Sequence, residues 1–213
     1  TYEYDLMDRC IKETNSLGKS EKYVYDKNGR LTEVTDREGN RTVYQYDKAG
    51  RLIKEKTGLF ETTYTYDGAG NLLTVTDASG TIKRSYDKLN RVTSVTDHNG
   101  KTIKYSYDEL GNRICLTYPG GETVRYTWDE CQQLIRMTDT AGGITTYAYD
   151  DTGRLTETER PDGSVEVRTY DKAGRLTQLR DTAADGEVLQ DLAYSYDARG
   201  NITKIEGTDQ SAA

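Results

Sequence analysis

The stretch Tyr44-Gln45-Tyr46-Asp47-Lys48-Ala49-Gly50-Arg51-Leu52 carries the pattern that decides the fold of this chain. Its tyrosine–aspartate pair recurs along the sequence at spacings of 20 or 21 residues and, once, of 26 residues. The pairs are Tyr4-Asp5, Tyr25-Asp26, Tyr46-Asp47, Tyr66-Asp67, Tyr86-Asp87, Tyr107-Asp108, Tyr149-Asp150, Tyr170-Asp171 and Tyr196-Asp197, with Trp128-Asp129 in the remaining place. Ten units in phase predict one tandem array over residues 1–213, with an insertion near residues 181–190 in the last spacing.

Each unit contains two turn signals about ten residues apart. Asp47-Lys48-Ala49-Gly50 is an example of the first, and Asp36-Arg37-Glu38-Gly39 of the second. Aspartate at the first position and glycine at the fourth favour a type I turn, because the carboxylate bonds nearby amides and glycine accepts a positive φ. Asn90 and Gln132 replace glycine at two first turns, and Arg160-Pro161-Asp162-Gly163 is a variant of the second.

The residues between turns predict strands of about six residues. Arg30-Leu31-Thr32-Glu33-Val34-Thr35 and Arg41-Thr42-Val43-Tyr44-Gln45-Tyr46 are rich in β-branched and aromatic residues, and helical spacing of apolar residues is not sustained anywhere. The sequence therefore predicts an all-β fold, a long antiparallel β-meander of about twenty strands. An open sheet of this size is expected to coil as a spiral or shell wall.

The tyrosines indicate how the sheet packs. Eight units carry a second aromatic residue two positions before the pair, namely Tyr2, Tyr23, Tyr44, Tyr64, Tyr105, Tyr126, Tyr147 and Tyr194. Residues two apart on a strand share a face, so we expect the rings to form columns across the sheet, with contacts between strands. Arg84 and Arg168 fill the other two places and can stack on the rings. Leu31 and Val34 are an odd number of positions apart, which indicates either two covered faces or a bulge.

Composition excludes several classes of function. Hydrophobic residues make up 34% of the chain and charged residues 31%, and 18 tyrosines accompany one phenylalanine and one tryptophan. These values predict a thin sheet whose faces are partly exposed to solvent, rather than a globular domain with a thick hydrophobic core. The net charge is −7, with no basic patch of the kind that binds nucleic acid. No apolar run approaches the roughly 18 residues of a membrane span.

Candidate sites for chemistry are weak. Calcium repeats have a shorter period and denser glycine, so the repeated aspartates are interpreted as turn residues. His98 is the single histidine and lies in a predicted turn, and Cys10, Cys115 and Cys131 match no zinc spacing. Gly120-Gly121 lacks the lysine and helix of a phosphate loop. We predict no catalytic residue, no cofactor and no metal.

The unit Tyr-x-Tyr-Asp-x-x-Gly-Arg-Leu, as in residues 44–52, resembles the YD repeat of RHS-repeat proteins, over the whole chain. This family includes bacterial RHS toxins, wall-associated proteins, the B and C components of insecticidal toxin complexes, and teneurins. The resemblance implies a spiralling β-sheet that closes into a hollow shell and, in bacterial members, encloses a C-terminal toxin. The Asp-Pro motif that ends bacterial shells is missing, since Pro119 and Pro161 do not follow aspartate. We therefore expect this chain to be a fragment of a larger shell.

These observations lead to the hypothesis of a non-catalytic shell segment that encapsulates and helps deliver a toxin, in a secreted or cell-surface protein. Its expected partners are the rest of its own shell and the enclosed toxin segment, with cell-surface glycans or proteins as further candidates. The alternative is an extracellular adhesion or carbohydrate-binding module, because exposed tyrosines can stack on sugar rings. The residues expected to carry the repeat structure are Tyr25, Asp26, Gly29, Tyr44, Tyr46, Asp47, Gly50, Leu52, Tyr64, Tyr66, Asp67, Gly70, Tyr105, Tyr107, Asp108, Gly111, Tyr147, Tyr149, Asp150 and Gly153.

Overall fold

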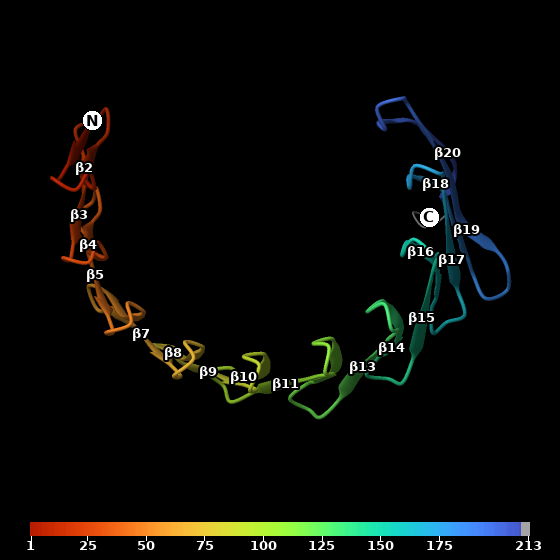
Figure 1. Cartoon of the computed structure of the whole chain (residues 1–213), viewed down its shortest axis with the longest axis horizontal. Helices are drawn as coiled ribbons and strands as arrows, with labels where there is room; N and C mark the ends of the chain where they lie inside the picture. Colours follow the sequence, from red (N-terminus) through yellow and green to blue (C-terminus); the bar gives the residue numbers. More distant parts are fainter. Residues whose placement is uncertain (210–213) are drawn as a thin grey trace. The chain divides into compact units, whose positions relative to one another are not determined.

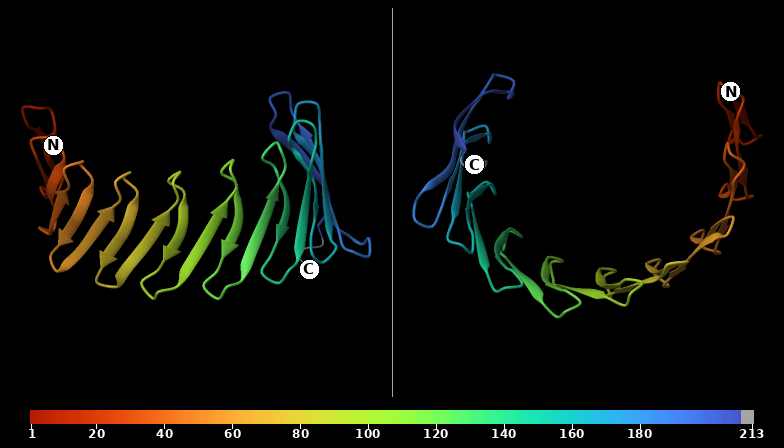
Figure 2. Two further views of the ribbon diagram at one scale, coloured as in Figure 1. Left: turned by 60° about the horizontal axis from the view of Figure 1, so that its bottom comes forward. Right: turned by 180° about the vertical axis from the view of Figure 1, so that it is seen from behind.

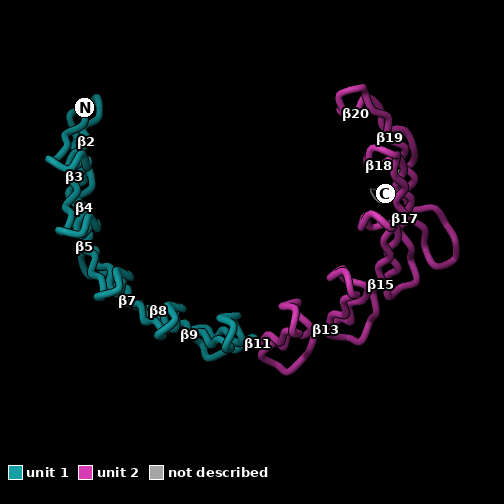
Figure 3. The backbone as a smooth tube through the Cα atoms, in the orientation of Figure 1, with its two compact units in different colours: residues 1–103 teal, residues 104–213 magenta. Residues whose placement is uncertain are grey.

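The computed structural model describes residues 1–209, and all regular structure in this range is β-strand (Figure 1). No helix in this range is long and apolar enough to cross a membrane. The chain divides into two compact units, residues 1–103 and residues 104–213 (Figure 3). Each unit is described separately below.

Unit 1 contains ten strands, which pair antiparallel in the order in which they occur in the chain. They are β1 (Tyr2–Tyr4), β2 (Cys10–Thr14), β3 (Ser20–Tyr25), β4 (Leu31–Thr35), β5 (Arg41–Tyr46), β6 (Leu52–Thr57), β7 (Phe60–Tyr66), β8 (Leu72–Asp77), β9 (Gly80–Tyr86) and β10 (Val92–Thr96). In unit 2, β11 (Thr102–Tyr107), which begins at the boundary, is followed by β12 (Arg113–Thr117), β13 (Thr123–Trp128), β14 (Leu134–Thr138), β15 (Ile144–Tyr149), β16 (Leu155–Glu159), β17 (Val165–Tyr170), β18 (Leu176–Thr182), β19 (Val188–Tyr196) and β20 (Ile202–Asp209), again antiparallel in sequence. The all-β antiparallel meander predicted from the sequence is confirmed.

Both units are single layers of sheet, with strands side by side and no second layer against either face (Figure 2). No hydrophobic side chain in the described part of the chain is fully buried. The two most buried polar residues are Thr145, at 8% exposure, and Ser164, at 6%. Strand pairing and half-buried side chains therefore hold the sheet, rather than a dry core.

The predicted first turns are present. In the turn that follows β5, the N–H of Gly50 donates to the carbonyl of Asp47 at 3.1 Å, and the N–H of Asp47 donates to the carbonyl of Arg51 at 2.9 Å. Gly50 has a φ of +86°. Asn90 and Gln132, at the glycine position, also adopt positive φ, of 62° and 61°. The Asp-x-x-Gly pattern thus predicts the backbone conformation of these turns correctly.

The two spacings of 20 residues arise from shortened second hairpins. Thr57 pairs with Phe60, so that only Gly58 and Leu59 connect β6 to β7. Asp77 likewise pairs with Gly80, across a loop of Ala78 and Ser79. In the spacing of 26 residues, the extra residues lie in β18 and β19, which extend to seven and nine residues. Changes of repeat length are therefore confined to the second hairpin.

A bulge settles how the two apolar residues of the second strand are oriented. In the β3–β4 pair, Tyr23 lies opposite Val34 and Tyr25 lies opposite Leu31, with a register shift at Tyr25 that leaves Thr32 as the extra residue. Directly opposite residues share a face of the sheet, so Leu31 and Val34 lie on the same face as both tyrosines. We call this the tyrosine face.

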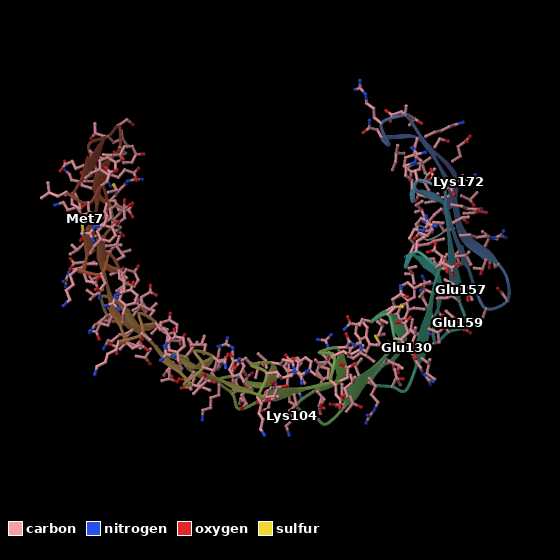
Figure 4. The ribbon with its side chains drawn as sticks, viewed as in Figure 1. Met7, Lys104, Glu130, Glu157, Glu159 and Lys172 are labelled. Carbon is pink, nitrogen blue, oxygen red and sulfur yellow. The ribbon has the colours of Figure 1, made fainter. Side chains whose placement is uncertain are left out.

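The opposite face is polar. In the β15–β16 pair it carries Glu157 and Glu159, which lie across from Ala148 and Thr146. Lys104 has the same orientation on β11, across from Thr117. Figure 4 shows side chains projecting from both sides of the ribbon in each unit. The two faces therefore differ: one gathers the tyrosines and leucines, with some charged residues such as Glu55 and Arg168, and the other is mainly polar, with exposed valines such as Val24 and Val167.

Candidate functional site

The contacts between successive repeats form the candidate site, and they begin with the aspartate of each first turn. Asp47 Oδ1 accepts hydrogen bonds from the N–H groups of Ala49 at 2.9 Å and Arg51 at 3.0 Å. Its Oδ2 accepts from Arg51 Nε at 2.7 Å. The bond from the Arg51 backbone and that from its guanidinium hold the pKa of Asp47 below its usual value. The same aspartate–arginine pair occurs at Asp5–Arg9, Asp26–Arg30, Asp87–Arg91, Asp150–Arg154 and Asp171–Arg175.

The arginine of this pair also reaches into the next repeat. Arg30 Nη1 donates to the carbonyl of Asp47 at 3.2 Å, and its guanidinium carbon lies 5.0 Å from the centroid of the Tyr46 ring. This distance is within the range of a cation–π interaction. Equivalent stacked pairs are Arg9–Tyr25, Arg51–Tyr66, Arg154–Tyr170 and Arg175–Tyr196, at 4.7–4.8 Å.

The tyrosine of the pair returns a bond to the previous repeat. Tyr46 donates its hydroxyl hydrogen to the carbonyl of Leu31 at 2.8 Å. The same bond joins Tyr25 to Cys10, Tyr66 to Leu52, Tyr86 to Leu72, Tyr149 to Leu134, Tyr170 to Leu155 and Tyr196 to Leu176, at 2.6–3.0 Å. We call this set of arginine and tyrosine contacts between adjacent repeats the junction.

Trp128 shows what the junction requires from the aromatic residue. Its indole Nε1 donates to the carbonyl of Arg113 at 3.0 Å, in place of the tyrosine hydroxyl. Arg113 stands where most other repeats have leucine, and its guanidinium carbon lies 4.8 Å from the centroid of the Tyr126 ring. An aromatic ring with a polar hydrogen at its far end is therefore sufficient to make this bond.

The residue that follows a first turn lies beside the glycine position of the next first turn. Where that residue is arginine, as at Arg30, its Nη1 lies 3.8 Å from the position that a Cβ on Gly50 would occupy. Where it is the shorter Asn71, the next turn carries Asn90 instead of glycine, and Asn71 Nδ2 donates to Asn90 Oδ1 at 2.7 Å. Asn112 is followed by Gln132, and here the direction is reversed, because Gln132 Nε2 donates to Asn112 Oδ1 at 3.5 Å. The two departures from glycine each contact an asparagine of the preceding repeat, whereas Gly153 lies beside the longer Gln133. We interpret Asn90 and Gln132 as compensation for the short asparagine side chain.

The sequence-predicted residues lie in the first turns and in the junctions between repeats. The aspartates and glycines form the turns, and the tyrosines of the pairs form the junction bonds. Tyr44, Tyr64 and Tyr147 lie on the tyrosine face beside them, and burial raises the pKa of Tyr44 and Tyr64. The sequence analysis does not predict the role of the arginine, although arginine recurs four residues after aspartate in six repeats.

The rings of the tyrosine–aspartate pairs make contacts that the sequence did not predict. Tyrosines of successive repeats are two strands apart, roughly 10 Å, which is beyond the range of ring contacts. The rings of Tyr25, Tyr46 and Tyr66 contact arginines of the preceding repeat instead. Arg168, which stands in a tyrosine place, pairs with Glu166. Arg84 has a buried Nη1 with no hydrogen-bond partner in the described residues.

Other candidate residues lie apart from the junctions. His98 is on an exposed turn, where its Nε2 is 3.0 Å from Asn99 Nδ2. Cys10, Cys115 and Cys131 are free thiols. Within residues 1–209, no group of three or more histidine, cysteine, aspartate or glutamate side chains is arranged to hold a metal ion. The hollows between second hairpins are shallow, and one of about 450 Å³ lies beside Glu159 and Pro161.

Comparison with known families identifies the repeat. A family model described as RHS Repeat matches residues 25–59, 60–82, 86–123, 132–165, 149–188 and 170–212. The chain belongs to the RHS repeat family. The resemblance inferred from the tyrosine–aspartate motif is thus confirmed. No curated protein gives a significant match to this RHS repeat array.

Solved structures show the same fold. The RHS repeat array is similar to a crystal structure of TcdB2-TccC3, with a TM-score of 0.77 and 20% identity over 98% of this chain. It is similar to a structure of the Photorhabdus luminescens Tc holotoxin pore, with a TM-score of 0.76 and 20% identity over 98% of this chain. In both cases the array spans 12% of the length of the solved chain.

Proposed function

We propose that this RHS repeat array is a structural, non-catalytic segment of the wall of a shell that encloses a toxin polypeptide. The observation that carries the proposal is the junction, which repeats the same contacts from one unit to the next. Such a wall can be extended by adding repeats, because each repeat contacts only the repeats before and after it. The enclosed segment would be protected until delivery, in a secreted or cell-surface protein.

Three features support a wall rather than a ligand site. The sheet is a single layer without a buried hydrophobic core. Its turn aspartates are alike in environment, whereas acid–base catalysis needs carboxylates with different pKa values. The solved structures of similar fold are Tc toxin assemblies by their titles. In this proposal the array is a fragment of the complete wall, and its partners are the adjoining repeats and the toxin segment.

The adhesion alternative receives less support from the side chains. A sugar ring stacks on the open face of an aromatic residue. In this sheet the rings of Tyr46 and Tyr66 have an arginine guanidinium at 5.0 and 4.7 Å. These ring faces are engaged in holding the repeats together.

The test uses the full-length parent polypeptide, purified under native conditions, treated with protease and examined by denaturing mass spectrometry. We expect a downstream segment that survives within an intact repeat region, or that is already cleaved and still co-purifies. Digestion in urea is the control, and there the same segment must be lost. A downstream segment that is digested at once under native conditions, or a membrane or wall anchor in its place, would refute the proposal and favour an adhesin.

A further inference from the structure

One carboxylate on the tyrosine face of unit 1 lies between two tyrosines. Glu55 on β6 is directly opposite Tyr44 on β5 and Thr62 on β7. Tyr64 is two positions beyond Thr62, so it is a diagonal neighbour within reach of the Glu55 side chain. Burial and the charge of Glu55 raise the pKa of both Tyr44 and Tyr64, which agrees with this placement. We call Tyr44, Glu55 and Tyr64 the Glu55 site.

Glu55 has no ion pair with any described residue, although two lysines flank it in the sequence. Lys54 and Lys56 lie on the opposite face, where Lys54 Nζ is 2.7 Å from Glu61 Oε1 and Lys56 Nζ is 3.9 Å from Glu61 Oε2. The Glu55 side chain is half-buried. Partial removal of an unpaired charge from water costs free energy, and a bound cation would offset this cost.

The same order of tyrosine, glutamate and tyrosine occurs earlier in unit 1, and there the glutamate holds a guanidinium. Glu13 on β2 lies opposite Tyr2 on β1, with Tyr23 as its diagonal neighbour on β3. Arg37, from the turn after β4, donates from Nη2 to Glu13 Oε1 at 2.7 Å. The Arg37 side chain is 33% exposed and the Glu13 side chain 32%, so this ion pair is partly shielded from solvent. We call this arrangement the Glu13 site.

The Glu55 site lacks the arginine and has a hollow beside it instead. Counted from the aspartate that ends the strand, Ala78 occupies the position of Arg37, because Asp77-Ala78 corresponds to Asp36-Arg37. A hollow of about 240 Å³ lies there, lined by Phe60, Thr62, Asp77 and Ala78 among others. Thr62 is the residue opposite Glu55, so the hollow adjoins the site. Asp77 adds a second negative charge to its lining.

We propose that the Glu55 site binds the guanidinium of an arginine on a polypeptide segment that packs against the tyrosine face. The guanidinium donates to the Glu55 carboxylate, as Arg37 does to Glu13. A guanidinium suits this site better than an ammonium, because it can bond a carboxylate and stack on an aromatic ring together. The charges of Glu55 and Asp77 select a cationic partner. This proposal depends on the Glu55 site alone and is independent of the proposed shell and cargo.

An NMR titration of the isotope-labelled 213-residue chain with N-acetyl-arginine methylamide tests the binding. We expect saturable shifts of the backbone amides of Glu55, Thr62 and Ala78. Glu55→Gln should weaken this binding about tenfold, the effect of losing a hydrogen bond to a charged group. Glu157→Gln is the control, because Glu157 is an exposed carboxylate on the polar face, and it should leave binding unchanged.

The outcomes of this titration separate the proposal from its alternatives. The absence of saturable shifts at the Glu55 site would overturn it, and so would equal binding by the Glu55→Gln variant. N-acetyl-lysine methylamide should bind more weakly than the arginine compound, because an ammonium cannot make the planar contacts. Equal binding of the two compounds would overturn the assignment to arginine and indicate a site for any organic cation.

Two substitutions in the turns exchange the states of the two sites. Ala78→Arg should fill the Glu55 site from within the chain, abolish binding of the arginine compound there and raise the folding equilibrium constant about fivefold in urea denaturation. Arg37→Ala should empty the Glu13 site, so that the arginine compound also shifts the Glu13 amide. Ala78→Gln is the control, since it lengthens the side chain without a charge. An Ala78→Arg variant that is no more stable than Ala78→Gln and still binds the arginine compound would contradict the proposal.

Discussion

Arg30 lies with its guanidinium carbon 5.0 Å from the ring centroid of Tyr46, which belongs to the following repeat. The same guanidinium bonds Asp26 in its own turn at 2.7 Å. One side chain therefore connects the conformation of a turn to the packing of the next unit. A change at any of these three residues is expected to loosen both.

The hydroxyl of Tyr46 is expected to contribute measurably to stability, because it bonds the carbonyl of Leu31 at 2.8 Å. Tyr46→Phe should lower the free energy of unfolding by about 1 kcal/mol, measured by urea denaturation. Tyr44→Phe is the matched control, since the Tyr44 hydroxyl makes no hydrogen bond within the described residues. Equal effects of the two substitutions would show that the junction bond contributes nothing.

Arginine at the junction should not be replaceable by lysine. Lysine keeps the charge but cannot bond Asp26, bond the Asp47 carbonyl and stack on Tyr46 together. Arg30→Lys should therefore destabilise the fold by about 1 kcal/mol through the lost stacking and the lost bond. Arg41→Lys should have little effect, because Arg41 is exposed and pairs only with Glu33. Thermal melts of both variants compare them, and similar midpoints would argue against the triple role.

Two glycines of the first turns should respond differently to alanine. Gly50 has a φ of +86°, which is unfavourable for alanine by about 1–2 kcal/mol, so Gly50→Ala should destabilise by that amount. Gly68 does not adopt positive φ, and a Cβ there would meet no atom within 4 Å. Gly68→Ala should be neutral or slightly stabilising. A Gly68→Ala variant as unstable as Gly50→Ala would mean that space, rather than φ, limits these turns.

The pairing of Asn71 with Asn90 should be exchangeable for arginine with glycine. Asn71→Arg alone places a guanidinium against the Asn90 side chain, and Asn90→Gly alone removes the partner of Asn71. The double variant recreates the arrangement of Arg30 and Gly50. A double-mutant cycle should give a favourable coupling of about 1 kcal/mol. Additive effects would refute the compensation.

Acid should weaken the array through its turn aspartates. Hydrogen bonds from Arg154 and Thr152 side chains hold the pKa of Asp150 well below its usual value, and bonds from Arg51 do so for Asp47. A carboxyl with a lower pKa in the folded state contributes stability that is complete above its unfolded pKa, about 4, and is lost as the pH falls towards the folded pKa. The melting temperature should therefore fall below about pH 4.

The pH profile of an Asp150→Asn variant tests this assignment. Its decline in melting temperature below the unfolded pKa should be shallower than that of the unmodified chain. Asp151→Asn is the control, because Asp151 makes no hydrogen bond within the described residues. Identical slopes for the Asp150→Asn variant and the unmodified chain would place the acid sensitivity elsewhere.

The sequence predicts the backbone of this protein wherever turn residues determine its conformation. Asp47 and Gly50 specify a turn by their own chemistry, and the intervals between such turns specify the strands. The orientation of Leu31 and Val34 could not be decided in the same way, because the extra residue Thr32 has no distinctive side chain. The register between β3 and β4 shows that both residues lie on the tyrosine face.

The junction was harder to predict because it joins residues from different repeats. Arg30 and Tyr46 are adjacent only once the strand between them is in place. A pattern of identical tyrosines favoured contacts between like residues, yet a strand spacing of roughly 4.8 Å keeps alternate strands too far apart for this. The arginine side chain lies between the tyrosines of successive repeats. The sequence pattern that could have indicated this is the recurrence of arginine four positions after aspartate in six repeats.

The junction bonds span short stretches of sequence, from 14 residues between Tyr66 and Leu52 to 22 between Arg175 and Asp197. Chains whose contacts are this local fold rapidly for β proteins, because little loop entropy is lost before each contact forms. Each repeat can be completed once about twenty further residues have emerged from the ribosome. The array can thus be assembled vectorially, in the order of its own synthesis.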